Sequence, residues 1–105
     1  MKSLYPDTAI NFGSEISISA DGTTLVVGNK GNSNCGTGVN PVINSAEVCN
    51  FSGAIEVYEL VGNTWVHRSF IKDHFSSSYA YFGSKVSISA DGNYISVGHI
   101  NDLGA

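Results

Sequence analysis

The residues FGSEISISADGTTLVVG at 12–28 return as FGSKVSISADGNYISVG at 82–98, an offset of 70 positions, with 11 of 17 aligned residues identical. In each stretch, aliphatic and small polar residues alternate as far as an Asp-Gly pair, and a second aliphatic run follows. Alternation with a period of two predicts a strand. Asp-Gly between two such runs predicts a tight turn of type I′. The chain thus contains one β-hairpin twice.

Two further strands are predicted between the repeated hairpins. Residues 54–60 and 64–71 are rich in β-branched and aromatic side chains, and Gly62-Asn63 between them favours a second tight turn. No part of the chain shows the 3.6-residue period of an amphipathic helix. Four strands that repeat along a sequence are typical of β-propeller blades. The predicted fold class is therefore all-β: an antiparallel four-stranded β-propeller-type blade plus the first hairpin of a second blade.

The predicted division of the chain follows from this order of strands. It comprises an N-terminal connector at 1–11, a first blade at 12–71 with a long loop at 29–53, a connector at 72–81 and the first hairpin of a second blade at 82–105. A period of 70 exceeds the roughly 40–50 residues usual for such repeats, and the long loop accounts for most of the excess. A small six-stranded sandwich or barrel is the alternative, but it does not require two nearly identical hairpins.

Composition limits the classes of partner. Only 13% of the 105 residues are charged, about half the usual share, and 12 are glycines, which suits short strands joined by tight turns. The net charge is −4 and the five basic residues are scattered, so we expect neither nucleic acid nor an anionic membrane surface as a partner. No apolar run is long enough to span a bilayer, and the first residues lack the apolar core of a signal peptide. We therefore expect neither membrane insertion nor self-directed export.

Both cysteines lie in the long loop, as Cys35 and Cys49, 14 positions apart. Loops of this length inside a compact domain are usually functional or held in place. A disulfide would hold this one, with a chain-entropy contribution of ~3 kcal/mol for about 15 residues. Two free thiols in a cytosolic protein are the alternative. The disulfide predicts an oxidising compartment, so we expect an extracellular, cell-surface or periplasmic protein.

Nothing in the sequence specifies a metal site or a reaction. Zinc needs four ligands, and His67, His74 and His99 show no ligand spacing with the cysteines or with each other. The same histidines lie near no recognisable Ser or Cys nucleophile motif. Asp21 and Asp91 could form a carboxylate pair for glycoside hydrolysis, but their place at equivalent turns favours turn chemistry. We predict no enzyme, no metal and no cofactor.

With these residues in view, the chain resembles FG-GAP repeat proteins, the β-propeller family that includes the integrin α-chain head, and most closely its bacterial and environmental branch. The likeness runs from residue 12 onward through the repeated hairpins and the segments SGAIEVY at 52–58 and GNTW at 62–65. It implies a closed propeller of about seven blades, of which this chain spans about one and a half. The residues of the structural motif are Phe12, Gly13, Asp21, Gly22, Phe82, Gly83, Asp91 and Gly92.

The resemblance also implies roles for some of these residues. Phe12 and Phe82 would wedge between blades, while Gly13 and Gly83 would adopt a backbone conformation or a close approach forbidden to other residues. Many integrin-type repeats carry an Asp-rich calcium loop between their first two strands. Here each such turn offers one carboxylate, whereas calcium takes six or more oxygen ligands, so neither turn is expected to bind the metal alone.

The predicted function is that of a non-enzymatic binding or structural module that recognises a protein or a carbohydrate. Loops on a rigid scaffold usually carry recognition, so the long loop is the expected contact region. Its candidate binding residues are Asn34, Thr37, Asn40, Asn44 and Glu47. Tyr58, Trp65 and Phe70 form either an aromatic platform for a glycan or packing between blades. Asn50-Phe51-Ser52 also matches the N-glycosylation sequon.

Two other functions fit the sequence. Copies of the chain could associate into a homo-oligomer through the open edges of their blades, because an unpaired strand edge invites pairing. Alternatively, the chain is a non-catalytic part of a larger propeller enzyme whose active residues lie elsewhere.

Overall fold

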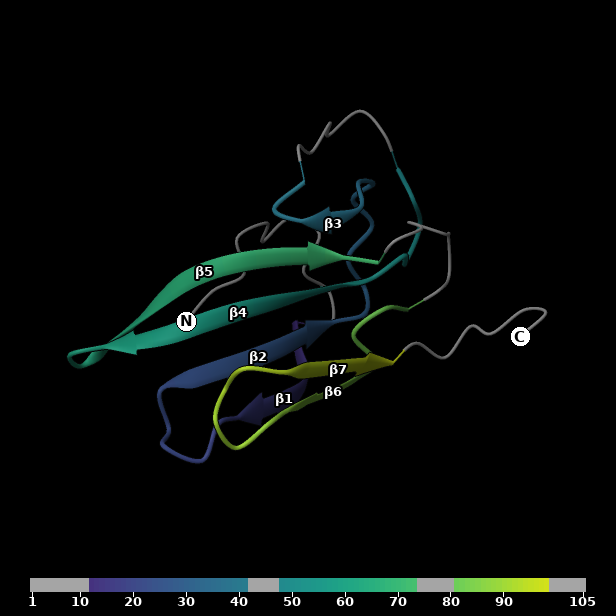
Figure 1. The fold of residues 1–105 in the computed structure, drawn as a ribbon. Helices are drawn as coiled ribbons and strands as arrows, with labels where there is room; N and C mark the ends of the chain where they lie inside the picture. Colours follow the sequence, from purple (N-terminus) through teal and green to yellow (C-terminus); the bar gives the residue numbers. More distant parts are fainter. Residues whose placement is uncertain (1–11, 42–47, 74–80, 99–105) are drawn as a thin grey trace.

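The structure, a computed structural model, describes residues 12–41, 48–73 and 81–98. Within these ranges it is all-β and antiparallel in both sheets, as predicted, and contains no helix. A five-stranded sheet has the order β1-β2-β4-β5-β3, and β6 and β7 form a separate two-stranded sheet (Figure 1). The strands are β1 (Phe12–Ile18), β2 (Thr24–Asn29), β3 (Gly38–Val39), β4 (Ala54–Val61), β5 (Thr64–Lys72), β6 (Lys85–Ile88) and β7 (Ile95–Gly98).

The larger sheet has one strand more than the four predicted. The extra strand is β3, which forms within the long loop and pairs with β5 at the edge of the sheet. Its residues Gly38 and Val39 lie opposite Lys72 and Ile71. A strand of two residues has no alternation for a sequence to display, so the pattern of aliphatic residues could not predict it.

The turns of both repeated hairpins differ from the predicted type I′, which needs a positive φ at both central residues. Gly22 has a φ of 74°, but Asp21 is not among the residues with positive φ. The Gly22 N–H donates to the Ser19 carbonyl at 3.0 Å, and the Ser19 N–H donates to the Thr24 carbonyl at 2.9 Å. Four residues therefore lie between the bonded pair Ser19 and Thr24, and the prediction of type I′ is wrong.

The Asp side chain explains this longer turn. Oδ1 of Asp21 accepts hydrogen bonds from the Ser19 hydroxyl at 2.7 Å and from the hydroxyl and N–H of Thr23 at 2.7 and 3.1 Å. These bonds, that from Ser19 foremost, hold the pKa of the Asp21 carboxyl below its usual value. A carboxylate that bonds the backbone two residues ahead favours an Asx-type turn over the two-residue turn of type I′.

The second hairpin repeats the same turn. Oδ1 of Asp91 accepts from the Ser89 hydroxyl at 2.6 Å and from the Asn93 N–H at 3.0 Å, and these bonds lower its pKa. Gly92, with a φ of 77°, donates its N–H to the Ser89 carbonyl at 3.0 Å. The same sequence thus produces the same local structure twice, and each Asp serves its own turn.

The β6–β7 hairpin lies against one face of the five-stranded sheet, over β1 and β2 (Figure 1). The core between the two sheets is built on Val26, Ile55 and Phe82. Partly buried aliphatic side chains surround it: Val57, Ile71, Val86, Ile88, Ile95 and Val97. Burial of aliphatic surface from both sheets is the main favourable term that holds them together.

Backbone meets backbone where the Phe82-Gly83 segment crosses the five-stranded sheet. Phe82 is buried, and its N–H donates to the Ser52 carbonyl at 2.9 Å. A Cβ atom at Gly53 would collide with the Phe82 carbonyl. A Cβ atom at Gly83, whose φ is 94°, would collide with the carbonyl of Ala54. Glycine is the residue type that permits this crossing.

The first copy of the Phe-Gly motif is described in part. The Phe12 backbone pairs with Asn29 at the start of β1, whereas the predicted wedging of its side chain lies outside what the structure describes. Gly13 has a φ of 86°, and a Cβ atom added there would meet nothing within 4 Å. Gly13 is therefore required only for its positive φ. Gly83 is required both for its positive φ and because no Cβ atom fits at its position.

Candidate functional site

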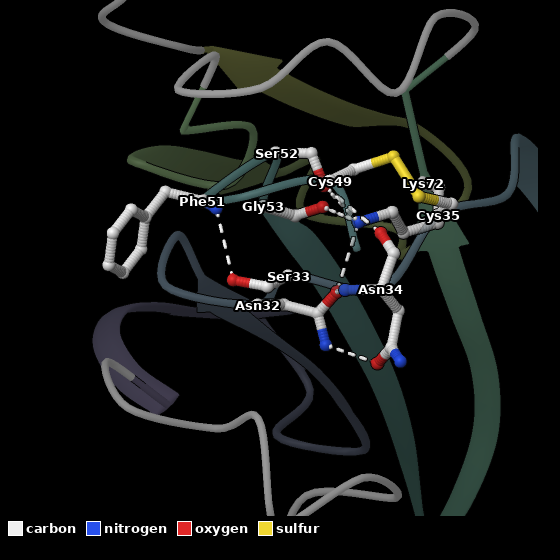
Figure 2. Close-up of a disulfide and its surroundings, with 9 residues drawn as sticks. All are labelled: Asn32, Ser33, Asn34, Cys35, Cys49, Phe51, Ser52, Gly53 and Lys72. Atoms are coloured by element: carbon white, nitrogen blue, oxygen red, sulfur yellow. Dashed lines mark hydrogen bonds between the residues drawn. A yellow bond between two sulfur atoms is a disulfide. The ribbon is translucent and has the colours of Figure 1, made fainter. Parts of the chain in front are cut away.

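The disulfide predicted within the long loop is present. Cys35 and Cys49 are joined, with their Cα atoms 5.2 Å apart (Figure 2). The bond links the two described parts of the loop, residues 30–41 and 48–53, here called the first arm and the second arm. Disulfides persist in oxidising compartments such as the extracellular space and the periplasm.

Lys72 ties both arms to the sheet. It ends β5, and its side chain is buried, with only 2% of the residue exposed. Its Nζ atom donates hydrogen bonds to Ser52 Oγ at 2.7 Å, to the Gly53 carbonyl at 2.6 Å and to Asn32 Oδ1 at 3.0 Å (Figure 2). An ammonium group has three N–H donors, so these three acceptors satisfy it fully.

Burial lowers the pKa of Lys72 to about 7, and the charge of the neighbouring Asp73 opposes that shift. Removal from water disfavours the charged form of an amine. The three acceptor oxygens favour the charged form, because a neutral amine can donate only two hydrogen bonds. Lys72 is therefore a buried group whose geometry suits the ammonium while its surroundings weaken proton binding.

Direct hydrogen bonds also join the two arms. The Ser33 carbonyl accepts from the Cys49 N–H at 2.9 Å, and the Ser33 hydroxyl accepts from the Phe51 N–H at 3.0 Å. The Ser52 hydroxyl donates to the Asn34 carbonyl at 3.1 Å. With the disulfide and Lys72, these bonds hold the arms in one arrangement.

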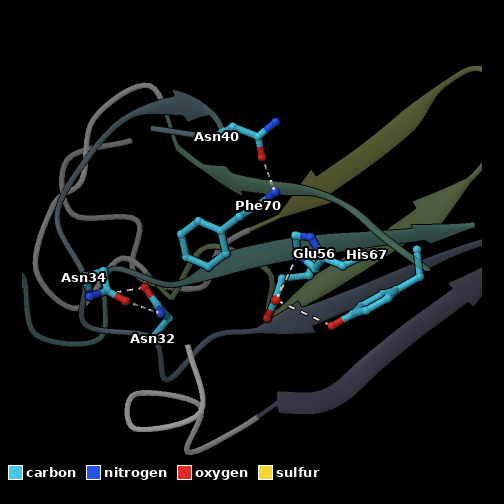
Figure 3. A network of polar contacts seen from close by, with 7 residues as sticks. Asn32, Asn34, Asn40, Glu56, His67 and Phe70 are labelled. Atoms are coloured by element: carbon cyan, nitrogen blue, oxygen red, sulfur yellow. Dashed lines mark hydrogen bonds and ion pairs between the residues drawn. The ribbon is translucent and has the colours of Figure 1, made fainter. Parts of the chain in front are cut away.

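The three predicted binding residues that the structure describes, Asn34, Thr37 and Asn40, do not share one surface, because Asn34 is buried. Asn34 is buried, at 6% exposed; its Oδ1 accepts from the side chain of Asn32 at 2.9 Å and its N–H donates to Asn32 Oδ1 at 3.1 Å (Figure 3). Asn34 therefore stabilises the first arm from inside. Thr37 is exposed, whereas Asn44 and Glu47 lie outside the described residues.

Asn40 is exposed and also has a structural role. Its φ of 48° is unusual for a residue other than glycine, although asparagine tolerates it better than most. Its N–H donates to the Phe70 carbonyl at 2.7 Å, and its Oδ1 accepts from the Phe70 N–H at 2.8 Å (Figure 3). Asn40 thus binds the end of the first arm to β5. The neighbouring residues Thr37 and Val39 are exposed.

The aromatic residues of β4 and β5 do not form an exposed platform. Tyr58 and Phe70 are buried, and Trp65 is half-buried. The alternative of a glycan platform from these three side chains is therefore wrong, because two of them lie in the interior. Asn50 of the sequon is exposed, and the hydroxyl of Ser52 in the same sequon is buried.

A buried carboxylate that the sequence reasoning missed lies on β4. Glu56 is fully buried, and the Tyr58 hydroxyl donates to its Oε1 at 3.5 Å. Nε2 of His67 lies 3.2 Å from the same oxygen, in a geometry outside that of a hydrogen bond (Figure 3). Burial, followed by the nearby charge of Glu56, raises the pKa of Tyr58. Glu56 shares one face of β4 with Ala54 and Tyr58, which are also buried. That alternation is the sequence signal that could have predicted the burial of Glu56.

Among the described residues, no group of three or more His, Cys, Asp or Glu side chains could hold a metal ion. The same part of the chain holds no helix of the length and apolar character that crossing a membrane requires. The only described cysteines are those of the disulfide.

Comparison of the chain with protein-family models, with curated proteins and with solved structures finds no match.

Proposed function

We propose that the chain is a non-enzymatic recognition module, a β-propeller-type unit of the FG-GAP kind that binds a protein or a carbohydrate through its disulfide-bonded loop. The observation that carries this proposal is the fixation of the loop. A disulfide, the Lys72 hydrogen bonds and the bonds between the arms all act on the same segment. Together they hold the exposed residues of that segment in one arrangement on a rigid scaffold, which is where recognition residues are usually found.

Fixation favours recognition because an ordered loop loses little conformational entropy when a ligand binds. The exposed end of the first arm offers the Thr37 hydroxyl and the Val39 side chain, which is 64% exposed. A hydroxyl beside an apolar group suits a carbohydrate or the surface of a folded protein. The disulfide supports an extracellular, cell-surface or periplasmic location.

The propeller part of the proposal is supported by the packing of the repeated hairpin. The β6–β7 hairpin, whose sequence pattern repeats that of β1–β2, lies face to face on the sheet that contains β1 and β2. Radial repetition of such sheets is the arrangement of β-propeller blades.

Two probes test the function: a glycan array and a random-peptide display library. The loop variant is Thr37→Arg combined with Val39→Asp, and the control is Val61→Asp, at an exposed position at the end of β4. The proposal expects binding by the wild-type chain, at least a tenfold weaker signal for the loop variant and an unchanged signal for the control. Binding that survives in the loop variant, or no binding to either probe, would reject it.

A further inference from the structure

The two copies of the hairpin have the same sequence pattern but unequal surroundings. Ile88 is the counterpart of Ile18, 70 positions earlier, and it packs on the core between the sheets. Val86 is the counterpart of Ile16 and packs there as well. Ile16 and Ile18 themselves are 63% and 52% exposed. We call the surface that these two residues form on β1 the isoleucine face.

The opposite surface of the second hairpin is also open. Ser87 and Ser96, which are paired across β6 and β7, are both exposed, and we call the surface that they form the serine face. Ser17 is the counterpart of Ser87 in the first hairpin, and it lies within the contact between the two sheets. Each hairpin therefore has a face that is used inside the molecule in one copy and left uncovered in the other.

The contact inside the molecule shows how two such faces fit. The Ile88 N–H donates to the Ser17 hydroxyl at 3.1 Å, and the Ala20 N–H donates to the Ala90 carbonyl at 3.0 Å. The same two groups are present on the uncovered faces. Ile18, the counterpart of Ile88, has the N–H donor, and Ser87, the counterpart of Ser17, has the hydroxyl acceptor.

We propose that the serine face of one molecule docks on the isoleucine face of a second copy and reproduces the contact that already joins the two hairpins within each molecule. The Ser87 hydroxyl of one copy then accepts a hydrogen bond from the Ile18 N–H of the next. Because each copy uses two different surfaces, the association is head to tail and continues into a ring or a filament. This inference does not rest on the ligand proposed for the loop, which is a separate surface.

The contact between copies is weaker than the one inside the molecule. Val26, which belongs to the core between the sheets, has Ser96 as its counterpart, so one aliphatic side chain is lost. Two hairpin faces also form a small interface, and interfaces below about 1,200 Å² are characteristic of weak encounters. Covalent capture is therefore the appropriate first test.

In the capture test, Ile18→Cys and Ser87→Cys variants of the full chain are mixed and oxidised, and disulfide-linked heterodimers are counted by mass spectrometry. The control mixes Ser87→Cys with Val61→Cys, whose position is 50% exposed and lies outside both faces. Docking expects at least a fivefold higher yield of heterodimer than the control. An equal yield for the two mixtures would overturn the proposal.

Sedimentation velocity of concentrated protein tests the head-to-tail order. Ile18→Asp blocks one face and Ser87→Arg blocks the other, and both positions are exposed, so each variant should keep the native circular dichroism spectrum. The wild-type chain should form species larger than dimers, each variant alone should remain monomeric, and their mixture should stop at a dimer. Association of Ser87→Arg alone would indicate pairing of two isoleucine faces, and association of both single variants would indicate strand-edge pairing; either result contradicts the proposal.

Discussion

The Nζ atom of Lys72 lies 2.7 Å from the Oγ atom of Ser52, although 20 residues separate them along the chain. Ser52 belongs to the second arm of the loop and Lys72 ends β5, so their contact fastens the loop to the sheet. The same nitrogen reaches Asn32 in the first arm. One buried side chain thereby holds both arms independently of the disulfide.

Replacement of Lys72 by methionine keeps the side-chain volume but removes a donor from three buried acceptors, of which Asn32 Oδ1 keeps its hydrogen bond from the Asn34 N–H. We expect the free energy of unfolding to fall by about 1–3 kcal/mol, the usual cost of unsatisfied buried polar groups. Urea denaturation measures it. Lys85→Met, at an exposed position on β6, is the control and should change stability by less than about 0.5 kcal/mol. Equal losses for the two variants would show that the Lys72 hydrogen bonds do not stabilise the fold.

Stability should also rise with pH because of Lys72. Its pKa is about 7 in the folded protein, below the value of 10.5 for an ordinary lysine. Between these values the unfolded chain binds more protons than the folded chain, so raising the pH favours folding. We expect the free energy of unfolding to increase from pH 7 to about pH 9 in the wild type. Lys72→Met should abolish that increase, and a rise of the same size in the variant would assign it to another group.

Loss of the disulfide should destabilise the protein without changing its sheets. Cys35→Ala combined with Cys49→Ala releases a closed loop with a sequence separation of 14. The chain-entropy estimate for such a loop is ~3 kcal/mol. Denaturant titration measures the loss, and hydrogen exchange should quicken in the two arms more than in β2 and β4. Mass measurement of alkylated wild-type protein before reduction should find no free thiol, and two alkylated thiols would refute the pairing.

Substitutions at Gly83 and Gly62 should distinguish two requirements for glycine, a positive φ and the lack of space for a Cβ atom. Both have positive φ, but a Cβ at Gly83 would strike the Ala54 carbonyl, whereas one at Gly62 would meet nothing within 4 Å. Gly62→Ala should cost about 1–2 kcal/mol from the left-handed backbone alone. Gly83→Ala should cost roughly 3 kcal/mol or more, because overpacking adds to the same strain. Thermal unfolding measures both, and similar losses would mean that the crossing at Gly83 has room to relax.

Local patterns were sufficient to predict the repeated hairpins. Alternation of Ile16, Ser17 and Ile18 depends on the geometry of a single strand, and the sequence records it directly. The pairing of Cys35 with Cys49 could also be predicted, because the chain has no other cysteine. The type of turn could not, because the hydrogen bonds of Asp21 with Ser19 and Thr23 compete with the general preference of Asp-Gly.

The long loop was predicted least well. It was predicted to be the contact region, with Asn34 among its binding residues, yet Asn32, Asn34 and Ser52 are buried. That arrangement joins residues 20 to 40 positions apart and has no periodicity. Lys72 itself falls where β5 ends, and only the return of the loop beside β5 explains its burial. Contacts between distant segments, rather than propensity, decided this part of the structure.

The glycine crossing has a consequence for how this architecture can vary. At Gly53 and Gly83 the two sheets meet through main-chain atoms, whose positions no side-chain substitution alters directly. We therefore expect these backbone contacts to set the angle and the distance between the two sheets. The aliphatic side chains beside the crossing then fill the space that remains. A change in the volume of Val26 or Val86 should therefore disturb the orientation of the sheets less than a methyl group added at Gly83. Substitutions should therefore be tolerated more readily at the aliphatic residues beside the crossing than at Gly53 and Gly83.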